Sequence, residues 1–177
     1  MSNSVNTKVT PTSEEIHMND KDFIVSKTDA KGKISYCNEI FIRFSGYEEK
    51  DLIDQPHNII RHPDMPRAVY RFMWETLQNK QEFFGIVKNL CKNGAYYWTF
   101  ANVTPSYDDG KLIGYYSVRR QPSRKIIEIL TPVYQRMVAE EKKYSSSKEA
   151  MDASFKILSN ILETEGLSYN EFIYTHA

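Results

Sequence analysis

The alternation of apolar and polar residues predicts five β-strands, which occur along the chain as a group of two and then a group of three. In the second group, Asn93-Gly94 and Asp109-Gly110 fall between apolar runs and predict hairpin turns. We therefore expect an α+β fold class with a five-stranded antiparallel sheet. The strands are expected at residues 23–28, 34–36, 83–90, 95–105 and 112–120.

Between the two groups of strands, apolar residues recur at the three-to-four spacing of short helices. Asn38 is expected to cap the first helix and Gly46 to end it. A longer helix is expected to begin near Met65, where Asp64 is a candidate N-cap and Pro66 suits the first turn. The three helices are expected at residues 39–45, 47–53 and 65–79.

Beyond residue 122 the pattern predicts helices without further strands. Residues 123–143 carry one apolar stripe, with Pro132 inside it. A second stripe must also be buried, either on its own domain or as the surface for a dimer or another partner, and both interpretations stay open. The residues after Gly166 are expected to form a short tail. The second stripe consists of Met151, Phe155, Leu158 and Leu162.

Residues 55–66 (QPHNIIRHPDMP) place several ionisable side chains in a segment that holds three prolines. Proline fixes φ and restricts the residue before it, so a shaped loop is expected. Arg61 offers a rigid donor fork that suits a pyrophosphate or an anionic ring edge, and the alternative is a surface salt bridge with Asp64 or a nearby glutamate. His62 has an ordinary pKa of about 6.5, which suits a proton-linked role, and the alternative is a water-exposed residue at a helix start.

Charge and cysteine content argue against some classes of protein. The 177 residues include 23 basic and 23 acidic side chains, and this balance argues against a general nucleic-acid binder. Cys37 and Cys91 lack metal-type spacing and are expected to be reduced, as in the cytoplasm. Because no apolar run reaches the roughly 18 residues of a membrane span, we expect no direct membrane insertion. Catalytic and metal-binding motifs are absent from the sequence, so neither an enzyme nor a metal site is expected.

Three segments carry a resemblance to a known family. They are SGYEEKDLIDQPHNIIRHPDMPRAVYRFMW, GIVKNLCKNGAYYW and GKLIGYYSVRR. They closely resemble the PAS domain of bacterial aerotaxis (energy-taxis) receptors, from about residue 23 to residue 120 and into the following helix. The resemblance implies a PAS fold, with short helices on one face of the sheet. We therefore expect a flexible, loosely ordered N-terminal leader (1–20), a PAS sensor domain (21–122) and a C-terminal helical extension (123–177).

The resemblance also implies a cofactor, FAD, held non-covalently in the PAS cavity. At Phe83 the family usually has a tryptophan, and a phenylalanine there can stack or pack but lacks the indole N–H. The other positions that match family positions implicated in flavin binding are Asn38, Arg61, His62, Asp64, Trp74 and Asn89.

The function that this resemblance implies is a stand-alone cytoplasmic sensor of redox or oxygen (energy) state. Its partner would be a membrane-bound chemotaxis signalling protein or another PAS protein, with a homodimer through the sheet or the C-terminal helices as a further option. Phe83 keeps a cofactor-free PAS adaptor open as an alternative. Haem bound through His57 or His62 is a second alternative, and flavoenzyme catalysis a third.

Overall fold

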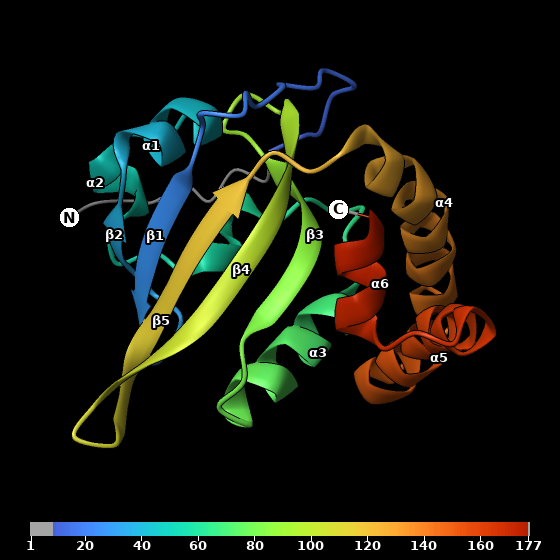
Figure 1. Cartoon of the computed structure of the whole chain (residues 1–177). Coiled ribbons are helices and arrows are strands. Elements are labelled where there is room, and N and C mark those ends of the chain that lie inside the picture. Colours follow the sequence, from blue (N-terminus) through green and yellow to red (C-terminus); the bar gives the residue numbers. More distant parts are fainter. Residues whose placement is uncertain (1–8, 177) are drawn as a thin grey trace.

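The computed structural model describes residues 9–176 and confirms the five-stranded antiparallel sheet (Figure 1). The strands follow the spatial order β2-β1-β5-β4-β3, so that the last strand in the sequence, β5, pairs with the first, β1. Each strand is antiparallel to its neighbours. Their bounds are Ile24–Asp29 (β1), Ile34–Cys37 (β2), Phe83–Leu90 (β3), Tyr96–Asp108 (β4) and Lys111–Arg120 (β5).

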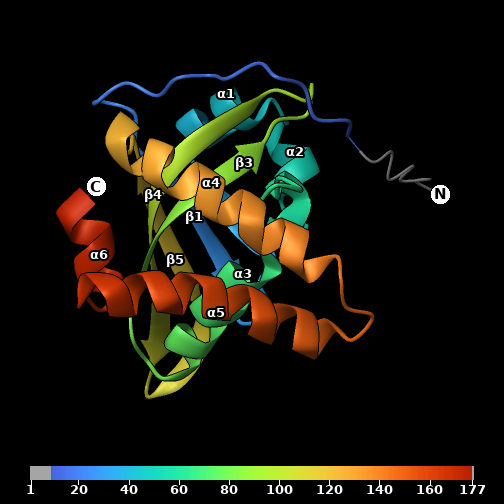
Figure 2. The same cartoon turned by 90° about the vertical axis from the view of Figure 1, so that its right-hand side faces the viewer.

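Short helices between β2 and β3 lie on one face of this sheet, as Figure 2 shows from the β3 side. The Oδ1 atom of Asn38 accepts from the backbone N–H of Phe41, and Gly46 ends the helix in the left-handed conformation (φ 70°), both as predicted. The helices are α1 (Glu39–Ser45), α2 (Glu49–Leu52), a 3₁₀ turn (His57–Ile60) and α3 (Arg67–Gln78).

The C-terminal helices pack onto the same chain, which supports the first interpretation of the second apolar stripe, although Met151 and Phe155 remain partly exposed. In Figure 2, α4 and α5 run across the β3 edge of the sheet, and α6 lies on the face opposite to α3. The stripe of α4 is buried along its whole length, and Leu158 and Leu162 of α5 join the same core. The helices are α4 (Arg124–Glu141), α5 (Ser147–Glu165) and α6 (Tyr169–His176).

The tail expected after Gly166 is in fact the helix α6, so that prediction is wrong. Ser168 and Glu171 form a reciprocal capping box: the backbone N–H and hydroxyl of Ser168 donate to the carboxylate, and the N–H of Glu171 donates to the hydroxyl. Phe172 and Ile173 are buried against the sheet. A capped eight-residue helix with an apolar face is stable here because the sheet buries that face.

The central part of β4 is buried on both faces, because helices cover the sheet from both sides. Tyr97, Thr99 and Ala101 face α1–α3, whereas Trp98 and Phe100 face the C-terminal helices. This explains why the sequence of the strand is a continuous aromatic run and does not alternate strictly between apolar and polar residues. No helix within residues 9–176 combines the length and the apolar character that crossing a membrane requires.

Two local predictions are corrected. The leader was expected to be loosely ordered, but in its described part the Ile16 N–H donates to the Tyr96 carbonyl at 2.7 Å, and Met18 is buried. The open start of β4 supplies these backbone partners, while residues 1–8 of the leader lie outside the described part.

Asp64 does not cap α3. The helix starts after Pro66, and no side-chain hydrogen bond from Pro66 caps it. The carboxylate of Glu141, at the end of α4, accepts instead from the backbone N–H groups of Arg67 and Ala68.

Candidate functional site

A cavity of about 270 Å³ lies between the sheet and α3, where the two hydrophobic cores of the chain meet. Leu77 and Phe83 belong to the core shared with the C-terminal helices, and Ile60 belongs to the core around α1 and β2. The volume is at the small end of the roughly 300–1,000 Å³ typical of ligand pockets, so it suits a single ring system and not a whole dinucleotide.

Helix α3 supplies an apolar wall. Tyr70, Met73, Trp74 and Leu77 follow one another at helical spacing, which places them on one face of α3, and all four line the cavity. The Trp74 indole stands edge-on to Tyr115 of β5 at 5.2 Å between ring centroids and remains 37% exposed. The tryptophan therefore forms part of the rim, with one side in the cavity and the other in water.

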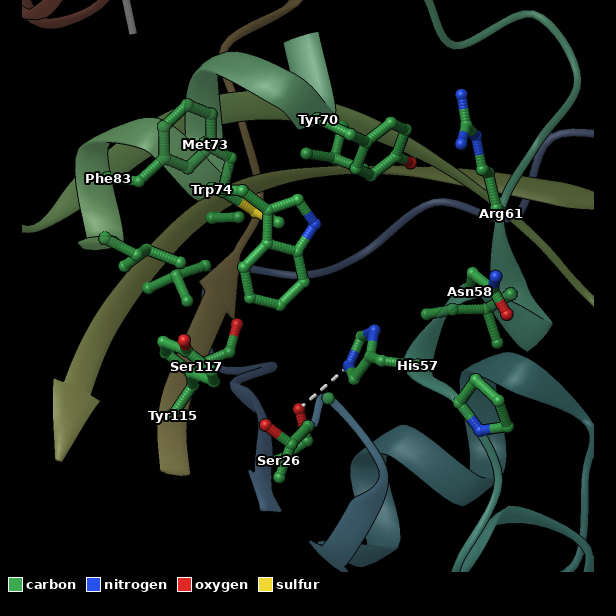
Figure 3. A pocket seen from close by; sticks show the side chains of 18 of the residues that line it. Ser26, His57, Asn58, Arg61, Tyr70, Met73, Trp74, Phe83, Tyr115 and Ser117 are labelled. Atoms are coloured by element: carbon green, nitrogen blue, oxygen red, sulfur yellow. Dashed lines mark hydrogen bonds between the residues drawn. The ribbon is translucent and has the colours of Figure 1, made fainter. Parts of the chain in front are cut away.

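Polar side chains from β1, β5 and the 3₁₀ turn form the opposite wall. Figure 3 shows Ser26, His57 and Ser117 across the cavity from Tyr70, Met73 and Trp74. Ser26 Oγ lies 3.1 Å from His57 Nε2 and accepts a hydrogen bond from Arg119 Nη2.

Burial and the nearby Arg119 charge lower the pKa of His57 to about 3, so its imidazole is neutral at physiological pH. The His57 ring stacks on Phe41 at 5.8 Å, and its Nε2 contacts the Ser26 hydroxyl. One face of this ring and its Nε2 are thus already occupied by protein groups.

The charge of the lining is entirely positive. Lys31, Arg61 and Arg119 line the cavity, and the lining residues include neither aspartate nor glutamate. Within residues 9–176, neither arginine has a carboxylate within 4 Å. A cavity with cationic donors and no acid is electrostatically suited to a ligand that carries negative charge or strong acceptors.

Four of the seven predicted site residues meet at this cavity: Arg61, Trp74, Phe83 and Asn89. The Arg61 guanidinium lies over the Tyr70 ring at 4.3 Å, and its backbone forms an isolated bridge with Asn89. The expected alternative, a salt bridge from Arg61 to Asp64, is absent among the described residues, because Asp64 pairs with Lys88 at 2.7 Å.

Asn89 and Phe83 reach the cavity from β3. Asn89 is 3% exposed and its amide N–H donates to Thr99 Oγ1, while no partner for its Oδ1 occurs in the described part of the chain. Phe83 is fully enclosed, and its ring lies parallel to Tyr169 of α6 at 6.0 Å. The position where the family usually has a tryptophan therefore contacts both the cavity and the C-terminal extension.

The other three predicted residues, Asn38, His62 and Asp64, are not among those that line the cavity. Asn38 uses its oxygen to cap α1 and its N–H to donate to the Phe23 carbonyl. His62 is buried with its ring edge-on to Tyr96, and its Nδ1 accepts from the Asp64 backbone N–H. Burial and the Lys88 charge lower the pKa of His62 to about 4, although Asp64 opposes that shift.

The lining residues that the sequence analysis missed include Ser26, His57 as a cavity residue, and Arg119. The missed signal was the pair Arg119-Arg120 in a predicted strand. Because side chains alternate along a strand, one of two consecutive arginines must face the interior. Arg119 does so at 3% exposure, and Arg120 faces the other side, over Phe100.

The two cysteines offer no reactive thiol. Both are free and buried, and the Cys91 thiol donates to the Phe44 carbonyl. Burial raises the pKa of Cys91 to about 12, so the nucleophilic thiolate is suppressed. Residues 9–176 also contain no cluster of three or more metal-ligating His, Cys, Asp or Glu side chains.

Comparison with known families matches residues 34–119 to the family described as PAS fold. The chain is 39% identical over 128 residues to the aerotaxis receptor of Escherichia coli (strain K12), which covers 72% of this chain and 25% of the receptor. It is 32% identical over 100 residues to the nitrogen fixation regulatory protein of Klebsiella pneumoniae, which covers 56% of this chain and 20% of that protein. The chain thus spans a quarter or less of the length of these two relatives.

Among solved structures, a light-oxygen-voltage domain studied with a flavin analogue superposes with a TM-score of 0.54 at 16% identity. The superposition covers 64% of this chain and 86% of that domain. At this identity the likeness shows the fold alone. The resemblance carried by the three sequence segments is confirmed by the family match and by the aerotaxis receptor.

Proposed function

We propose that this chain, which contains a PAS domain at residues 34–119, is a redox or energy-state sensor that binds FAD non-covalently. The observation that carries the proposal is the cavity itself, in which an apolar wall on α3 faces cationic and amide donors without any acidic side chain. The resemblance to aerotaxis receptors supplies the cofactor, and the homology to the aerotaxis receptor of E. coli supports a signalling role.

The residues present suit an isoalloxazine ring. Trp74, Tyr70 and Met73 offer apolar surface to the faces of a planar heterocycle, and Asn89 and Ser117 offer hydrogen bonds to its polar edge. FAD would supply reversible two-electron chemistry to this site. The protein would hold the ring, exclude water from it and place charge near it.

The remainder of FAD would extend past the rim of the cavity, since the cavity has room for the ring system alone. Arg61 is half-buried there and free of carboxylate partners among residues 9–176, and Lys31 lines the same cavity. A guanidinium fork suits a diphosphate because it can donate two parallel N–H groups to phosphate oxygens. We therefore assign Arg61 to the diphosphate.

The C-terminal helices are placed to receive the signal. Glu141 of α4 holds the first N–H groups of α3, the helix that forms the apolar wall. Tyr169 of α6 stacks on Phe83, which lines the cavity from β3. A change of charge in the cavity that shifts α3 or Phe83 would thus alter the packing of α4 and α6, a two-state response of the kind that sensors use.

The partner that we propose is a membrane-bound chemotaxis signalling protein or a second PAS protein, with a homodimer as a further arrangement. The cytoplasm is proposed as the compartment because both cysteines are free. We also propose that the chain is not an enzyme, since the His57 imidazole beside the Ser26 hydroxyl, with its pKa lowered to about 3, is too weak a base to activate that hydroxyl as a nucleophile.

A second candidate, a PAS adaptor without a cofactor, is favoured by one observation. The cavity is smaller than most ligand pockets, and Phe83 and Tyr169 fill the space next to it. Such an adaptor would take up no flavin when FAD is added, whereas the sensor would bind it.

The test is a titration of the full chain with FAD, FMN and riboflavin, followed by flavin fluorescence. We expect FAD to bind, and Arg61→Ala to weaken FAD by about 10- to 100-fold, because a charged hydrogen bond is worth roughly 1.5–3 kcal/mol. Riboflavin, which lacks phosphate, should bind both forms equally. The control is Arg136→Ala, an exposed position on α4. Equal FAD affinity in the wild type and Arg61→Ala would refute the assignment of Arg61, and no flavin uptake at all would favour the adaptor.

A further inference from the structure

Arg119 is a buried cation without a counter-charge. Its side chain leaves β5 on the cavity side and is 3% exposed. Nη2 donates to the Ser26 hydroxyl, whereas the Nε and Nη1 groups have no hydrogen-bond partner in the described chain. A guanidinium has five N–H donors, so most of its capacity is unused.

The groups around Arg119 do not neutralise it. His57 is neutral, as shown above, and the Tyr97 hydroxyl nearby is buried and without a partner. The ring face of Phe41 lies 4.7 Å from the guanidinium carbon and provides a weak cation–π attraction. Burial lowers the pKa of Arg119 to about 10, so the side chain still carries its charge at neutral pH.

An unpaired buried charge is costly for the folded state, and natural proteins retain such a charge where a ligand uses it. The adjacent residue, Arg120, shows that an arginine at this end of the strand can instead face water. Arg120 is exposed on the opposite face, over the Phe100 ring at 4.3 Å. The sheet thus directs one of two adjacent arginines into the cavity and the other into water.

We propose that Arg119 forms an anion subsite at the buried end of the cavity, where its free N–H groups bind a ligand edge that is, or becomes, negatively charged. For a flavin, in a reading that rests on the proposed function, this edge is the N1–C2=O side of the pyrimidine ring. For any other ligand, the same donors would select a planar carboxylate.

For a flavin the subsite affects the redox equilibrium. Uptake of two electrons from a reductant such as dithionite and of one proton from water adds one negative charge to the ring system, and this charge is shared by the N1–C2=O edge. Arg119 therefore stabilises the reduced ligand more than the oxidised one, and the midpoint potential rises. Loss of the positive charge should reverse this effect.

The test compares the wild type with Arg119→Met, Arg119→Lys and the control Arg120→Met, all loaded with FAD. The midpoint potential is measured by equilibration with reference dyes at pH 7. We expect Arg119→Met to lose at least about tenfold in the preference for the reduced ligand, which lowers the potential by about 30 mV for a two-electron couple. Arg119→Lys, which keeps the charge, should recover part of the loss, and Arg120→Met should match the wild type.

A second readout does not depend on flavin. The melting temperature of each protein without added flavin is measured with benzoate and with the uncharged benzamide. We expect benzoate alone to raise the melting temperature of the wild type, and neither compound to raise that of Arg119→Met. Arg119→Lys provides a second variant for this comparison if Arg119→Met fails to fold.

The outcomes separate the subsite from the proposed function. If the wild type takes up no flavin but benzoate stabilises it through Arg119, the FAD proposal fails and the anion subsite stands with a carboxylate ligand. A potential in Arg119→Met equal to that of the wild type overturns the subsite. So does a wild type that takes up no flavin and shows no preference for benzoate.

Discussion

Glu141 offers the sharpest test of how the C-terminal helices are attached to the wall of the cavity. Its carboxylate is 6% exposed at the end of α4 and faces the start of α3. Oε1 accepts from the Ala68 N–H at 3.0 Å, and Oε2 accepts from the N–H of Arg67 at 3.1 Å and from its Nε at 3.2 Å. A residue 74 positions away thus performs the role of an N-cap.

We expect Glu141→Ala to lower the free energy of unfolding by about 3 kcal/mol. Two backbone N–H groups lose a charged acceptor, at roughly 1–3 kcal/mol for each buried donor left unsatisfied. The Arg67 side chain is 41% exposed, so its share is small because water screens it. For a chain of this size, about 3 kcal/mol lowers the melting temperature by roughly 6–12 °C.

The assay is urea unfolding, followed by the combined fluorescence of Trp74 on α3 and Trp98 on β4 and by circular dichroism. Glu141→Gln, which keeps one acceptor oxygen, should lie between the wild type and the alanine variant. The matched control is Glu140→Ala, because within residues 9–176 the neighbouring carboxylate pairs only with Lys143 and Tyr144. If Glu141→Ala lowers the free energy of unfolding by no more than Glu140→Ala does, the Glu141 carboxylate does not stabilise the start of α3 and this link between α4 and α3 is wrong.

Two further predictions follow from buried groups. The folded state holds the pKa of His62 near 4, below its unfolded value of about 6.5. Between pH 6.5 and pH 4 the unfolded chain therefore binds more protons than the folded chain. The free energy of unfolding should fall by about 1.4 kcal/mol per pH unit as the pH drops through this range. His62→Asn, which keeps an acceptor near Nδ1, should make the stability–pH curve shallower in urea titrations, and an unchanged slope would contradict the burial of this ring. Gly114→Ala should destabilise the chain by about 3 kcal/mol, because a Cβ there would overlap the Thr28 carbonyl oxygen of β1. Gly110→Ala has open space around its Cβ and should cost only the strain of its left-handed backbone, about 1 kcal/mol, so equal losses in the two variants would disprove the close approach.

Much of the fold could be predicted from local patterns. Strand β4 was recognisable because the Asn93-Gly94 turn precedes a long aromatic run, and the stripe of α4 because its apolar residues recur at helical spacing. The tail after Gly166 was misjudged because eight residues with one capping box depend on tertiary burial to form a helix.

The site could be predicted only in part, for physical reasons that particular residues illustrate. Arg61 was identified because its loop is chemically unusual, and it does line the cavity. Arg119 was missed because its direction depends on the register of β5 against β1, which pairs Ser26 with Ser117. Residues close in the sequence also have different surroundings: Arg61 lines the cavity with its guanidinium over the Tyr70 ring, whereas Asp64 pairs with Lys88.

The absorption spectrum of the freshly purified full chain, before and after dithionite, tests the central claim most directly. We expect a two-banded flavin spectrum that bleaches on reduction and returns in air. A colourless protein that also fails to take up added FAD would contradict the redox-sensor proposal, and a sharp Soret band would contradict it in favour of haem.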